Sequence, residues 1–154
     1  MGRPKRSVRR VQANLRIDTR VHERLVSLAG DAGMPLATYL EHVVSQAHGY
    51  TGPYLSMHTL PTSLPLAQLR RRVKALDRHM CPPAPPAGAD PTVRVDAPLA
   101  RALKERARGF GVPYNHYLRA VLHLAAGFPA AGAGDQPELD FTDDEGREPS
   151  RRAS

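Results

Sequence analysis

The chain has 154 residues, which is enough for one domain, or two small ones, with tails. Its single cysteine, Cys81, excludes an internal disulfide framework, and no apolar run is long enough for a signal peptide or membrane span, so we expect a cytoplasmic protein. Lysine and arginine outnumber aspartate and glutamate by 22 to 15, and residues 135–154 hold seven of the acids. The positive excess of the first 134 residues favours a polyanionic partner, with nucleic acid ahead of an anionic membrane.

Residues 1–10 contain five lysines or arginines, and we expect them to form a flexible basic arm. Residues 11–50 then predict a strand followed by two helices. In "VQANLRID" (11–18) apolar and polar residues alternate, which is typical of a strand with one buried face, and we place the strand at 12–17. Asp18 is a good N-cap for the first helix. The apolar stripe of that helix is Val21, Leu25, Leu28 and Ala32, and the stripe of the second helix is Leu36, Leu40, Val43, Val44 and Ala47.

Residues 51–90 link this unit to the rest of the chain. Within them, residues 64–80 predict an amphipathic helix, and the proline-rich stretch 81–91 predicts an extended connector. The helix could pack on the neighbouring units, join a second copy of the chain, or contact nucleic acid through its arginines. Its apolar stripe is Leu66, Leu69, Val73, Leu76 and Met80.

Residues 91–128 repeat the first unit. A shift of 78 residues lays 15–50 on 93–128 without gaps, and eleven of the 36 aligned positions are identical. The second copy therefore predicts a strand (92–95), an N-cap at Asp96, and two further helices. The glycines and prolines between the helices, which are typical of one helix ending and the next beginning, are Gly33, Pro35, Gly111 and Pro113.

A unit with one lone strand cannot satisfy its strand edges or bury enough apolar surface by itself. Antiparallel pairing of the two strands would put Leu15 and Ile17 beside Val93 and Val95, above four helices. We therefore predict a mainly α fold with a short two-stranded antiparallel β-ribbon, in which the tandem units form an intramolecular pseudo-dimer. One face of this ribbon would carry Gln12, Asn14, Arg16, Thr92 and Arg94.

A strand with alternating polar residues followed by two helices resembles the ribbon-helix-helix (Arc/MetJ-type) family of DNA-binding proteins. Two such motifs in one chain are similar to TraY-type accessory proteins of conjugative plasmids. The resemblance implies that the ribbon enters the major groove of double-stranded DNA and reads bases, here through Gln12, Asn14, Arg16, Thr92 and Arg94. It also implies that helix N-termini hold phosphates, and free amides there favour anions on physical grounds. The predicted contacts to the DNA backbone, from the arm and from the two helix starts, are Arg3, Lys5, Arg6, Arg9, Arg10, Leu36, Ala37, Tyr114 and Asn115.

Two features depart from the family pattern. Pro35 and Pro113 lack an N–H, so we expect one phosphate donor fewer at each helix start. The second strand is preceded by Asp90, which can accept a hydrogen bond from cytosine but repels phosphate. We therefore expect a target site whose two halves differ.

These observations predict a transcriptional repressor, or an autoregulator of its own promoter. The alternatives are an accessory factor at a conjugation or partition site, an antitoxin whose acidic tail (129–154, expected to be disordered) binds a toxin, and a purely structural interaction module. Catalytic motifs and a metal-ligand spacing are absent from the sequence, so we expect neither an enzyme nor a cofactor.

Overall fold

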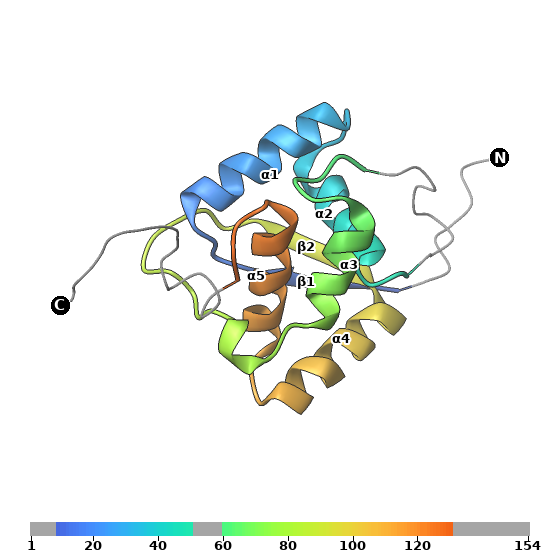
Figure 1. Cartoon of the computed structure of the whole chain (residues 1–154), viewed down its shortest axis with the longest axis vertical. Helices are drawn as coiled ribbons and strands as arrows, with labels where there is room; N and C mark the ends of the chain where they lie inside the picture. Colours follow the sequence, from blue (N-terminus) through green and yellow to red (C-terminus); the bar gives the residue numbers. More distant parts are fainter. Residues whose placement is uncertain (1–8, 51–59, 131–154) are drawn as a thin grey trace.

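The computed structural model describes residues 9–50 and 60–130, and within them it contains five α-helices and a two-stranded antiparallel sheet. Figure 1 shows the two strands side by side behind the helices, with α1 above them and α4 below in this view. The predicted fold class, mainly helical with a short antiparallel ribbon, is confirmed at this level. The elements are β1 (Arg10–Asn14), α1 (Thr19–Asp31), α2 (Leu36–Ala47), α3 (Leu66–Lys74), the 3-10 turn η1 (Arg78–Met80), β2 (Thr92–Asp96), α4 (Ala97–Phe110) and α5 (Tyr114–Ala125).

The register of the ribbon differs from the predicted one. Val11 and Ala13, not Leu15 and Ile17, lie opposite Val95 and Val93. The predicted faces are nevertheless correct, because side chains alternate with a period of two and an even shift in register leaves each residue on its own face. The pairing continues beyond β1, where the Ile17 amide donates to the Ala89 carbonyl (2.8 Å) and the Ala89 amide donates to the Ile17 carbonyl (3.0 Å).

The ribbon is centred on equivalent positions of the sequence repeat. Asn14 lies opposite Thr92, and these two residues are 78 positions apart, which is the offset of the repeat. On one side of this central pair Gln12 lies opposite Arg94. On the other side Arg16, the repeat equivalent of Arg94, pairs with Asp90, the equivalent of Gln12.

The helices α2 and α5 form the centre of the core. Both are buried over most of their length, and they include a charged residue at equivalent positions, Glu41 in α2 and Arg119 in α5. Arg119 donates to the carbonyls of Arg16 (2.8 Å) and Pro82 (2.7 Å), so its charge ties the ribbon and the connector to α5. Glu41 forms an ion pair with Arg10.

The predicted boundary between the arm and β1 is wrong, and the predicted N-cap at Asp96 is confirmed in position only. Arg10 belongs to β1, not to the arm, because its backbone pairs with Asp96 and its guanidinium is held by Glu41. Asp96 occupies the N-cap position of α4 without a side-chain capping bond; its carboxylate accepts from the Tyr50 hydroxyl instead (3.1 Å). Asp18, in contrast, caps α1 as predicted by accepting from the Arg20 amide (2.8 Å), and this bond lowers the pKa of Asp18.

The linker helix is shorter than the predicted 64–80. Arg106 of α4 donates to the carbonyls of Val73 and Lys74, both over 2.8 Å, and so satisfies the C-terminal end of α3. Asp77 then starts the separate turn η1 by accepting from the His79 amide. The interruption arises from a residue of the other motif, which local periodicity cannot reveal.

The apolar stripe of α3 packs within the chain, which was one of the three predicted alternatives. Leu69, Val73 and Leu76 are all buried, and α3 contacts both α2 and α5. Self-association through this stripe therefore has little apolar surface left to use. At the end of the described chain Ala130 is also buried, so the predicted tail does not begin at 129; residues 131–154 lie outside the described part.

Candidate nucleic-acid interface

The outer ribbon face consists of the five predicted base-reading residues. The opposite face of the ribbon packs against the helices: Leu15, Ile17, Val93 and Val95 are at most 1% exposed, and Val11 and Ala13 are half-buried. Because side chains alternate between the two faces of a strand, the polar side chains face away from the core. Four of the five are exposed and Thr92 is half-buried; the set is Gln12, Asn14, Arg16, Thr92 and Arg94.

Hydrogen bonds link four members of the outer ribbon face across the two strands. Arg94 donates through Nε to the Gln12 side-chain oxygen (3.1 Å), and Thr92 donates to the Asn14 side-chain oxygen (3.0 Å). Gln12 Nε2 also approaches Asn14 Oδ1 at 3.4 Å. These bonds hold the side chains in an ordered row, and each bond joins exposed groups, so water or a base edge can replace it at small cost.

Arg16 is held differently. Its Nε donates to Asp90 Oδ1 over 3.1 Å, and its Nη1 approaches the Pro86 carbonyl at 3.4 Å. The side chains of Arg16 and Asp90 are 45% and 58% exposed, so solvent screens the pair strongly. Arg16 is therefore tethered by a weak ion pair, whereas Arg94 has a neutral amide as its partner.

The N-terminus of α5 lies beside the ribbon. Asn115 donates from its side chain to the Asn14 carbonyl (3.2 Å), which places the first turn of α5 at the C-terminal end of β1. On the other side α2 packs along β2. The predicted backbone contacts Leu36 and Ala37 thus begin one flanking helix, and Tyr114 and Asn115 begin the other.

The two prolines reduce this anion-binding capacity only slightly. Pro35 and Pro113 occupy the N-cap positions, so the residues that follow them keep the first-turn amides. In α2 the first three positions are Leu36, Ala37 and Thr38, and amides at such positions have no acceptor within their own helix. The loss predicted from the sequence is limited to the N-cap amide.

Burial keeps the aromatic residue at the start of α5 neutral. It raises the pKa of Tyr114 to about 12, so the phenol stays protonated at physiological pH. The Lys104 ammonium lies 5.4 Å from the centre of the Tyr114 ring, within cation–π range. A cation from α4 thus stands next to the first turn of α5.

The predicted contacts from the basic arm are only partly within the described residues. Arg3, Lys5 and Arg6 lie outside them. Arg9 is exposed at the end of the ribbon, and Arg10 is engaged with Glu41 and is not available for phosphate without breaking that pair. Of the two described members, Arg9 is the better placed to meet a phosphate.

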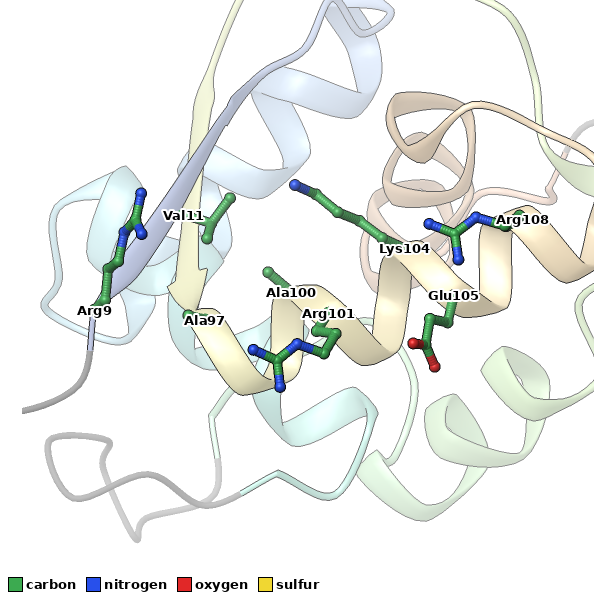
Figure 2. Close-up of a pocket in the computed structure, with 8 residues that line it drawn as sticks. All are labelled: Arg9, Val11, Ala97, Ala100, Arg101, Lys104, Glu105 and Arg108. Atoms are coloured by element: carbon green, nitrogen blue, oxygen red, sulfur yellow. The ribbon is translucent and has the colours of Figure 1, made fainter.

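Sequence reasoning missed the basic face of α4. Arg101, Lys104 and Arg108 follow one another at spacings of three and four residues, which places them on one face of a helix. Together with Arg9 they line a groove between α4 and the end of β1 (Figure 2). The helical spacing was readable from the sequence, but the contribution of Arg9 depends on the fold.

In residues 9–50 and 60–130, no three His, Cys, Asp or Glu side chains are grouped to hold a metal ion, and no helix there is long and apolar enough to cross a membrane.

Comparisons with protein-family models, with curated proteins and with solved structures find no match to the chain.

Proposed function

We propose that the protein binds double-stranded DNA in a sequence-specific manner by inserting its β-ribbon into the major groove. The observation that carries this proposal is the outer ribbon face, a row of amide, hydroxyl and guanidinium groups contributed by two paired strands over a sealed core. A two-stranded ribbon fits the width of the major groove, and Arg, Asn and Gln form bidentate bonds with guanine or adenine. Each such contact contributes about 1–3 kcal/mol of discrimination between bases.

We further propose that the chain is a tandem ribbon-helix-helix protein whose two motifs form an intramolecular pseudo-dimer. The register supports this, because the equivalent residues Asn14 and Thr92 lie opposite each other and the neighbouring pairs match across that centre. The N-terminus of α5, beside the ribbon, and that of α2, the helix that packs along β2, would then hold phosphates on the two strands of DNA.

The two halves of the proposed reading surface are unlike. Gln12 with Arg94 presents an amide and a cation, whereas Asp90 with Arg16 presents a carboxylate and a cation. The proposed target is therefore an asymmetric site. A protein of this kind would act as a transcriptional repressor by occupying promoters, including the promoter of its own gene.

A double substitution on the ribbon tests the proposal. Asn14→Ala with Arg16→Ala removes one amide and one guanidinium from the outer ribbon face, and we expect at least a tenfold loss of affinity for a selected duplex, with loss of sequence preference. The matched control, Gln68→Ala with Arg71→Ala, removes the same two groups from α3 and should retain both. Equal affinity and preference in the two variants, measured by fluorescence anisotropy, would show that the ribbon does not read DNA.

A further inference from the structure

A groove of about 310 Å³ runs between the end of β1 and one face of α4. Figure 2 shows Arg9 on the strand side of this groove, and Lys104 extending from α4 toward the ribbon. The lining contains four cationic side chains and one carboxylate. Its residues are Arg9, Val11, Ala97, Ala100, Arg101, Lys104, Glu105 and Arg108.

The four cations of this α4 groove outnumber its carboxylates, since Glu105 is the one acidic residue that lines it. Within residues 9–50 and 60–130 no ion pair joins any of the four to a carboxylate, and Glu105 makes none either. Four unpaired positive charges in one groove repel each other, and this repulsion falls when an anion binds between them.

The fold itself does not require this charge. The equivalent face on α1, 78 residues earlier, carries Glu23 for Arg101, Val26 for Lys104 and Gly30 for Arg108. Val26 is 45% exposed, so that position tolerates an uncharged side chain at the surface of the same element. The basic face of α4 therefore has no counterpart at the equivalent positions of α1.

The α4 groove is continuous with the candidate nucleic-acid interface. Its Lys104 lies over the ring of Tyr114, the first residue of α5, and α5 in turn contacts the C-terminal end of β1 through Asn115. Arg9 extends the groove to the end of the ribbon. The lining of α4 spans residues 97–108, which at about 1.5 Å per residue is roughly 16 Å of helix.

We infer that the α4 groove binds the phosphate backbone of DNA that flanks the segment read by the ribbon, and that it does so on one side only. This inference rests on the proposed DNA binding. A phosphate chain held at the N-terminus of α5 would lie beside Lys104, and the same groove offers it Arg108, Arg101 and Arg9. The equivalent face of α1 lacks these cations. The bound protein should therefore protect a longer stretch of DNA on the α4 side of the ribbon than on the α1 side.

The test compares two variants that each lose two charges. Arg101→Gln with Lys104→Gln removes two of the four positive charges of the groove. The control, Arg71→Gln with Lys74→Gln, removes two exposed cations from α3. The probes are a short duplex that carries only a selected site, the same duplex extended by one helical turn at both ends, and linear polyphosphate. Thermal unfolding verifies that both variants remain folded.

We expect the wild-type protein to bind the extended duplex more tightly than the short one, and its hydroxyl-radical footprint to extend further on one side. The groove variant should lose this gain and the extra protection, and the slope of log K against log salt should fall in magnitude by up to about 1.8, or 0.9 for each phosphate. The α3 control should behave as the wild type.

A groove variant that matches the control on the extended duplex and on polyphosphate would overturn the inference while leaving the ribbon proposal intact. If the wild type binds neither duplex, the proposed function fails. In that case, loss of polyphosphate binding in the groove variant but not in the α3 control would support a phosphate-binding groove without DNA reading. Equal polyphosphate binding by the groove variant and the α3 control would refute the phosphate-binding groove as well.

Discussion

Replacement of Asp90 by Asn is predicted to strengthen DNA binding. In the free protein Asp90 holds the Arg16 guanidinium at 3.1 Å, and DNA must displace it before Arg16 can reach a base. The carboxylate also faces the incoming phosphates, so its charge opposes binding in a second way. Asn keeps the shape and the acceptor oxygen, so a neutral hydrogen bond to Arg16 can remain, but it removes the ion pair and the repulsion of phosphate.

The expected gain is modest because the pair is exposed. With side-chain exposures of 45% and 58%, the ion pair contributes at most about 1 kcal/mol. Repulsion from a phosphate about 10 Å away through water adds about 0.4 kcal/mol. Together these terms predict an increase in affinity of up to about tenfold for Asp90→Asn.

Fluorescence anisotropy with a selected duplex at two salt concentrations measures this gain. The control, Asp31→Asn at the end of α1, removes the same charge from an exposed position outside the ribbon and should change affinity less. Unchanged affinity for DNA would show that the ion pair with Asp90 does not hinder Arg16 in reaching a base. A loss of affinity would mean that Asp90 itself accepts a hydrogen bond from a base.

Two predictions concern the stability of the fold. A Cβ at Gly88 would lie 2.0 Å from the Ile17 carbonyl oxygen, so Gly88→Ala should lower the free energy of unfolding by about 1–3 kcal/mol. The control, Gly109→Ala in α4, where the space is open, should raise it by about 0.5–1 kcal/mol. Urea unfolding measures both values, and equal stability of the two variants would contradict the pairing of Ile17 with Ala89 at the end of the ribbon. The second concerns His48, whose Nδ1–H donates to the Val44 carbonyl and whose Nε2 accepts from the Tyr117 hydroxyl. Burial lowers the pKa of His48 below 6.5, so the unfolded chain binds more protons between that lowered value and 6.5, and the free energy of unfolding should fall as the pH drops from 7.5 to 5.5. His48→Gln should reduce this fall, and a variant as acid-sensitive as the wild type would exclude His48 as its source.

The sequence was sufficient to predict that there are two strands, their faces and the helix pairs, but the first strand is Arg10–Asn14 and not 12–17. Alternation in "VQANLRID" assigned Leu15 and Ile17 to the core, and the repeat supplied a partner strand with Val93 and Val95. The register was predicted wrongly because alternation is unchanged by an even shift. Centring the pairing on equivalent positions, Asn14 with Thr92, would have given the observed register.

The remaining errors involve contacts between distant parts of the chain. Arg10 was assigned to the arm because its partner, Glu41, is 31 residues away on α2. The linker helix was predicted to continue to 80 because Arg106, which satisfies its C-terminal end, belongs to α4. Local patterns carry no information about such bonds, whereas the basic stripe on α4 was present in the sequence at helical spacing and was overlooked.

Selection of bound sequences from a random pool of duplex DNA tests the central claim most directly. If the outer ribbon face reads bases through Gln12 and Arg94 in one half and Arg16 beside Asp90 in the other, the wild-type protein should enrich one site with two unlike halves. The same selection with the Asn14→Ala, Arg16→Ala variant should lose the preference at the positions that these residues contact. A pool that shows no enrichment, or a symmetric palindrome that both proteins recover equally, would contradict the account.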